Sequence, residues 1–195
     1  KAFGKKEILS LAILGALYSF IINSAAEIMN PFFSEKFAIS AFWAGLYSGV
    51  WGVGTILGGV LGGRGTDKLG HRRSVLYAMI VSFASILLFL VVPNPWAAFP
   101  VALIFGFAFG FYETVYFAVS MARTDPRIAA AMFSILMAVA NIGTGIGLAV
   151  TGSLVDGLGF PVTFIIIAVF NLLALPLIPM VFRGKAADPA VAVEP

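Results

Sequence analysis

Two glutamates lie inside long apolar runs of this 195-residue sequence. A carboxylate at membrane depth is costly and usually marks a transport pathway or pairs with a cation. Glu113 lies about 16 residues from the outer end of its run, or about 24 Å along a helix, so its side chain cannot easily reach the outer surface. Burial favours the protonated form of a carboxyl, which suits Glu113 to proton exchange. The alternative is a structural ion pair with Arg72 or Arg73.

Amide side chains extend this set of polar residues. Asn23 and Glu27 lie one helical turn apart and are expected on one face, where Glu27 is close enough to the end of its run to reach the interface. Asn141 stands alone in another apolar run. With Glu113, these residues are the candidate proton or substrate pathway. Asn171, Tyr112 and Tyr116 are further candidates for lining a cavity, although each polar group can instead make a hydrogen bond between helices.

The composition predicts an integral membrane protein. The sequence is 61% hydrophobic and 11% charged, whereas soluble domains are about 25% charged. It contains no cysteine and one histidine, and it has neither a His-Glu-x-x-His pair nor a Gly-x-Ser-x-Gly elbow. We therefore expect no catalytic site, no metal and no cofactor. The cations lie in short segments between apolar runs, which sets membrane orientation and argues against nucleic-acid binding.

The apolar runs predict an all-α membrane protein with six transmembrane helices. A bilayer core of about 30 Å needs about 20 helical residues, and the sequence offers six runs of that length. Pro31, the Pro93-Asn94-Pro95 turn and the Gly157-Leu158-Gly159 turn are expected to break the pattern on one side. The predicted spans are 8–29, 42–62, 74–92, 97–120, 128–150 and 161–182. Residues 184–195 are predicted to be a disordered tail.

The distribution of cations predicts the orientation. The sequence has twelve Lys and Arg, and all but Lys36 fall on one side of the predicted spans. The positive-inside rule places that side in the cytoplasm. Both termini are therefore expected to be cytoplasmic, in a multi-pass protein of the cell (inner) membrane.

Glycines recur at intervals of four in three of the predicted spans. This spacing places them on one helical face, where two backbones can approach closely. The stripes are Gly45 and Gly49; Gly54, Gly58 and Gly62; Ala102, Gly106 and Gly110; and Gly143, Gly147 and Thr151. Static packing explains such stripes, and smooth faces that slide during transport are the alternative.

The segment between the second and third spans, GGRGTDKLGHRR, carries a recognisable order of residues. Its members are Gly63, Asp67, Lys68, Gly70, Arg72 and Arg73. This segment resembles motif A of the major facilitator superfamily and departs from it by placing His71 at the first basic position. We interpret His71 as filling that position rather than sensing protons, and a generic charged cytoplasmic turn is the alternative to the motif as a whole.

The resemblance implies a fold and a partner. Superfamily transporters have two six-helix halves around a central site, each built of inverted three-helix repeats. This chain would supply one half, and Asp67 would meet the start of a helix in the other half as a gating latch. A weaker resemblance, over a Thr-Asp-Pro-Arg turn followed by Gly152, Asp156 and Gly159, is to the muropeptide and acetyl-coenzyme A transporters of the superfamily.

The implied function is secondary active transport of a small solute by alternating access, with or without proton coupling. The second half would come from the same chain upstream, from a homodimer or from a different subunit, and the tail after the last span favours a carboxyl-terminal half. The rival hypothesis is a non-transporting membrane subunit or an assembly factor within a larger membrane complex.

Overall fold

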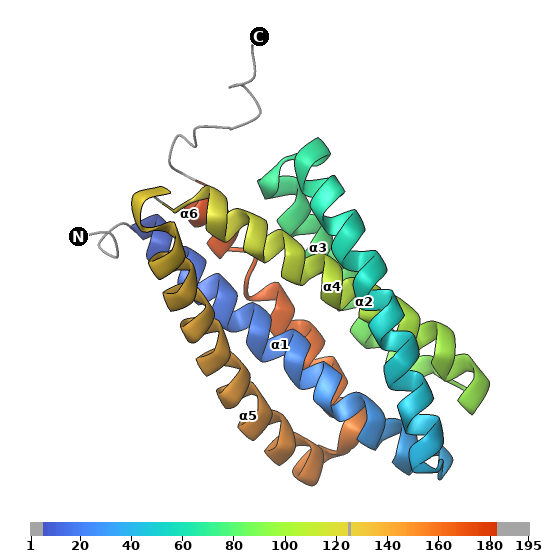
Figure 1. Cartoon of the computed structure of the whole chain (residues 1–195). Helices are drawn as coiled ribbons and strands as arrows, with labels where there is room; N and C mark the ends of the chain where they lie inside the picture. Colours follow the sequence, from blue (N-terminus) through green and yellow to red (C-terminus); the bar gives the residue numbers. More distant parts are fainter. Residues whose placement is uncertain (1–5, 125, 183–195) are drawn as a thin grey trace.

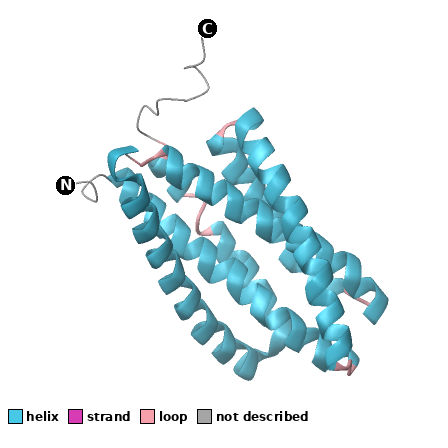
Figure 2. Cartoon of the chain, viewed as in Figure 1, coloured by secondary structure: helices cyan, strands magenta, loops and turns pink. Residues whose placement is uncertain are grey.

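The computed structural model describes residues 6–124 and 126–182, which form a bundle of long helices joined by short turns (Figures 1 and 2). The helices are α1 (Lys6–Phe37), α2 (Ala41–Leu69), α3 (His71–Leu88), α4 (Pro95–Ala122), α5 (Ala129–Leu172) and α6 (Leu177–Val181), with 3-10 turns at Phe89–Val91 and Pro126–Ile128. Among the described residues, five helices are long and apolar enough to cross a membrane. The predicted tail lies outside the described residues.

Helix α5 consists of two arms that meet at Gly159. The backbone there has φ 76° and ψ 168°, a combination essentially restricted to glycine. The first arm, 129–158, runs parallel to α1, because Gly143 lies against Ala16 and Gly147 against Phe20. The last long apolar stretch, Ala129–Val181, is therefore not one straight rod.

The second arm, 160–172, runs back along α1 in the opposite direction. Its Phe160 packs on Phe32 and its Phe170 on Phe20, with ring centroids 5.7 and 6.0 Å apart. The first arm contains most of the predicted fifth span and continues beyond it. The predicted sixth span, 161–182, is not one continuous helix, because the second arm ends at Leu172 and turns at 173–176 separate it from α6. The α2–α3 turn, the α4–α5 turn and both ends of the described chain lie together at one end of the bundle (Figure 1), which we call the basic end.

Several helices extend beyond the apolar runs that predict them. Helix α1 continues through Pro31 to Phe37, so the expectation that Pro31 ends it is wrong; a proline removes one backbone hydrogen bond, which a helix in a bundle tolerates. Helix α2 continues to Leu69, seven residues beyond the predicted span. Hydropathy locates the apolar run, whereas the helix ends where the backbone conformation changes.

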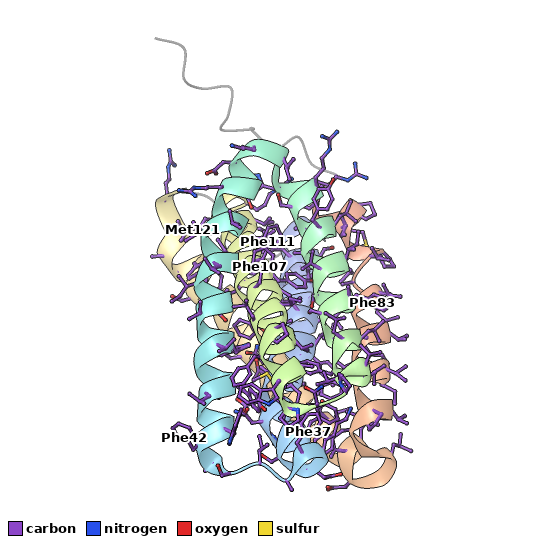
Figure 3. All side chains as sticks on the ribbon, turned by 90° about the vertical axis from the view of Figure 1, so that its right-hand side faces the viewer. Phe37, Phe42, Phe83, Phe107, Phe111 and Met121 are labelled. Atoms are coloured by element: carbon purple, nitrogen blue, oxygen red, sulfur yellow. The ribbon has the colours of Figure 1, made fainter. Side chains whose placement is uncertain are left out.

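The interface between α2 and α4 is a direct contact of two backbones. A Cβ at Gly54, Gly58 or Gly62 would collide with the backbone of α4, and a Cβ at Gly106 or Gly110 would collide with that of α2. Phe107 and Phe111 of α4 lie along this contact (Figure 3). Close approach is thus confirmed for these stripes, whereas a Cβ at Gly45 or Gly49 would have no atom within 4 Å.

Replacing Gly58 with Ala tests this interface. The new methyl would meet the Phe107 carbonyl oxygen, and relieving such overpacking costs about 1–3 kcal/mol. We expect a lower melting temperature in detergent, followed by circular dichroism. Gly49→Ala, on the open face of the same helix, is the control and should melt at or above the parent temperature. Equal melting of the two variants would contradict the backbone contact.

Candidate functional site

Glu113 lies where α1, α4 and α5 meet. It is half-buried on α4 and close enough to Tyr18 of α1 for the two side chains to interact electrostatically. One turn later on the same face, Phe117 packs against Phe133 of α5, with ring centroids 5.6 Å apart. The side chain of Glu113 therefore belongs to the face of α4 that looks toward α1 and the first arm of α5.

The structural alternative for Glu113 finds no support in the described part of the chain. Arg72 and Arg73 are exposed at the start of α3, and the described residues show no ion pair between Glu113 and either arginine. The carboxyl group instead lies beside aromatic rings. It is a titratable group half-buried within the bundle, without a compensating cation among the described residues.

Three tyrosines form a cluster beside Glu113. The ring of Tyr18 lies 4.5 Å from that of Tyr112 and 5.6 Å from that of Tyr116, centroid to centroid. The sequence suggested that Tyr112 and Tyr116 line a cavity, but each is 1% exposed in the core between α1 and α4. The buried Tyr112 hydroxyl has no hydrogen-bond partner among the described residues. A buried hydroxyl without a partner is energetically costly.

The other polar candidates, three amides and Glu27, divide into hydrogen-bonded and exposed side chains. Asn23 donates to Thr144 Oγ1 of α5 at 3.2 Å and to the Ser19 carbonyl at 3.1 Å. Glu27, one turn beyond Asn23, and Asn141, one turn before Thr144, are both exposed. The structure thus brings Asn23 and Asn141 to one α1–α5 surface. Asn171 does not line a cavity but makes a hydrogen bond between helices, the alternative given above, by donating to the Met79 carbonyl at 2.8 Å.

The depths of these groups can be compared through their neighbours. Gly143, two residues after Asn141, lies against Ala16 of α1, and Glu113 lies by Tyr18, two residues further along α1. Because the first arm of α5 runs parallel to α1, Asn141 and Glu113 lie about one helical turn apart in depth, on different helices. A polar surface contributed by α1, α4 and α5 results, with Glu113 and Asn141 nearer the basic end than the opposite end of the bundle.

The motif-like segment is helical rather than a loop. Asp67 is exposed in the last turn of α2, and Gly70, with φ 79° and ψ 153°, passes directly into α3. Gly63 is half-buried beside Thr114 of α4. The expected turn between the two spans is thus a single glycine between two helices, and Lys68, like the two arginines that follow, is exposed.

A cavity of about 280 Å³ opens at the basic end. Its lining joins the start of α3 to the ends of α4 and α6, and it consists of Leu69, Gly70, His71, Arg72, Arg73, Arg123 and Phe182. The Arg123 guanidinium lies 4.8 Å from the Phe182 ring centroid. The sequence did not single out Arg123, because its neighbours in the cavity come from segments far away along the chain.

The sequence matches the profile of the Major Facilitator Superfamily over residues 11–194. The chain belongs to this family, and its apolar helices make it an integral, multi-pass membrane protein. A search of curated proteins found no match.

Solved structures share the fold. The chain is similar to a peptide transporter crystallised with sulfate (TM-score 0.78, 20% identity, 93% of this chain and 39% of that one). It is also similar to a bacterial homologue of the human drug peptide transporters, with a TM-score of 0.80 and 16% identity over 93% of this chain and 42% of that one. A third similar structure is that of the xylose transporter XylE from E. coli in its inward-open conformation. Its TM-score is 0.71, with 17% identity over 97% of this chain and 52% of that one. This chain thus spans about half the length of these transporters or less.

Gly70→Ala tests the helix-to-helix turn. An L residue at this φ and ψ is strained by about 1–3 kcal/mol, so we expect the variant to unfold at lower temperature or denaturant concentration than the parent. Gly63→Ala is the control within the same segment, since a Cβ there makes an ordinary 3.8 Å contact with Thr114. If Gly70→Ala were as stable as Gly63→Ala, the turn would not depend on glycine.

Proposed function

We propose that this chain is one half of a secondary transporter that moves a small solute by alternating access. The observation that carries the proposal is the polar surface formed by Glu113, Asn23 and Asn141 on three different helices. Polar groups at membrane depth face protein or a water-filled cavity rather than lipid. A second six-helix body covering this surface would enclose a central aqueous site and shield the three residues from lipid.

The arrangement of the chain supports six membrane crossings. Four long helices, the first arm of α5, and its second arm together with α6 would each cross once. The cations at the basic end would place that end in the cytoplasm. Lys36 lies at the opposite end, in the last turn of α1. We infer that both termini are cytoplasmic and that the protein resides in the cell (inner) membrane.

Asp67 is proposed as a latch to the second half. It lies in the last turn of α2, where a carboxylate meets the negative end of its own helix dipole. The start of a helix in the other half would supply the opposite dipole end and free backbone N–H groups. The exposure of Asp67 leaves it accessible to such a partner, whether this comes from the same polypeptide, a second copy or another subunit.

Glu113 is proposed to couple transport to protons. It is half-buried, has no cation partner among the described residues and lies beside the tyrosine cluster. A carboxyl in such surroundings can alternate between neutral and charged forms as water reaches it from either side. Transport, rather than catalysis, is the function that this arrangement supports, and it requires no cofactor.

Glu113→Gln separates coupling from transport. The full-length protein in proteoliposomes is assayed with short peptides and with xylose, the cargo classes named for its structural neighbours. We expect the variant to lose the acceleration of uptake by an imposed proton gradient, reducing uptake to the gradient-free level, while exchange of solute persists. Glu35→Gln, which alters an exposed carboxyl near the other end of α1, should keep the acceleration. Unchanged proton-driven uptake by Glu113→Gln would refute coupling through this residue.

A further inference from the structure

The chain contains the same helix pair twice, in opposite directions. Helix α2 packs on α4 through Gly54 and Gly58, and the first arm of α5 packs on α1 through Gly143 and Gly147. The second pair of glycines follows the first by 89 residues, from 54 to 143 and from 58 to 147. Helix α2 runs toward the basic end, whereas the first arm of α5 runs away from it (Figure 1).

The contacts of the two pairs correspond residue by residue. Gly54 faces the Leu103 carbonyl and Gly143 faces that of Ala16; Gly58 faces Phe107 and Gly147 faces Phe20. The partners on α1 and α4 are themselves offset by a constant 87 residues, from 16 to 103 and from 20 to 107. The two halves of the chain are therefore related by an approximate twofold axis between the ends of the bundle.

The turns that end the two glycine helices correspond as well. Gly70 and Gly159 are 89 residues apart and are the two glycines with positive φ, at 79° and 76°, in the described part of the chain. Ser74 Oγ donates to the Gly70 carbonyl at 3.1 Å, and Thr163 Oγ1 donates to the Gly159 carbonyl at 2.8 Å. The same helix-to-helix turn thus occurs at both ends of the bundle.

Each turn carries an aspartate at the same position. Asp67 lies three residues before Gly70 and Asp156 three residues before Gly159, and both are exposed. Each carboxylate therefore stands in the last turn of a helix, at the negative end of the helix dipole, where its own helix disfavours it. A positive group outside the described chain would compensate for each of them.

We propose that Asp156 is a second latch, which binds the start of a helix in the second half and holds closed the end of the bundle opposite the basic end. The proposal rests on the proposed transport function and on the role given there to Asp67. The approximate twofold axis exchanges the two ends, so a contact that closes one end has its counterpart at the other. In alternating access, one aspartate would be engaged while the other is released.

The differences between the turns fit their opposite locations. Arg72 and Arg73 follow Gly70, whereas the corresponding positions after Gly159 are Pro161 and Val162. Cations are favoured on the cytoplasmic side of a membrane and not on the other. The aspartate and the glycine occur in both turns, which fits residues that the turn and its partner require. The cations occur in one turn only, which fits residues that orient the chain in the membrane.

The test measures access to the centre of the protein from each side. The chain contains no cysteine, so Asn141→Cys serves as the reporter in the full-length protein, with any cysteine elsewhere replaced. A membrane-impermeant maleimide is added to vesicles of each orientation. Asp156→Asn should raise the labelling rate from the side of Asp156 by about fivefold or more, the lower range of coupling between two states. Asp67→Asn should raise labelling from the basic end instead.

Two further variants act as controls. Glu35→Gln removes an exposed carboxylate of α1 on the same side as Asp156 and should label at the parent rate. Asp156→Glu keeps the charge and should also label at the parent rate, which separates loss of the latch from disturbance of the turn. Melting temperatures establish that each variant is folded.

The outcomes distinguish this proposal from the one on which it rests. If Asp156→Asn labels like the parent while Asp67→Asn shifts access, the second latch is refuted and alternating access stands. Equal acceleration by Asp156→Asn and Asp156→Glu, or by Glu35→Gln, also refutes it. If the reporter reacts from one side only in every variant, alternating access fails, and the second latch fails with it.

Discussion

The direct contact between backbones at the glycine stripes determines the rest of this structure. Within a membrane, apolar side chains gain little by leaving lipid for one another, so helices associate through close packing and interhelical hydrogen bonds. Gly58 and Gly110 place the axes of α2 and α4 so close that no side chain fits between them. Other faces of α4 carry buried aromatic side chains: Tyr112 packs on Tyr18 of α1 and Phe105 on Phe89, with ring centroids 4.5 and 5.1 Å apart.

The same packing constraint creates the polar surface. Tyr116 lies with its hydroxyl against Gly15 of α1, and this absence of a side chain allows α1 to approach α4 at the level of the tyrosine cluster. Glu113, one residue beyond Tyr112, is then held at the edge of a tightly packed interface rather than on a free helix surface. The position of the carboxyl group therefore follows from small residues on a different helix.

The sequence predicted the apolar runs, the glycine contacts and the intramembrane carboxylate, because each depends on local composition or on helical spacing. It did not predict that α2 would continue to Leu69, since a run of charged residues beyond the bilayer looks like a loop to a hydropathy argument. It also missed Tyr18 and Arg123. Their significance depends on neighbours in other helices, Tyr112 and Phe182, which only the packed structure brings together.

The site arises where the internal repeat is broken. Gly110 of α4 lies against the Thr55 carbonyl, and the hydroxyl of Thr55 donates to its own helix at Trp51. The corresponding positions, by the offsets of 87 and 89 residues found at the glycine contacts, are Asn23 and Thr144. There an amide replaces the glycine and donates to the threonine hydroxyl across the interface. A symmetric scaffold requires only small residues at both places. The amide at one of them adds a hydrogen bond between side chains to the α1–α5 interface, so the two symmetric helix pairs share their close packing and differ in the polar groups that they present.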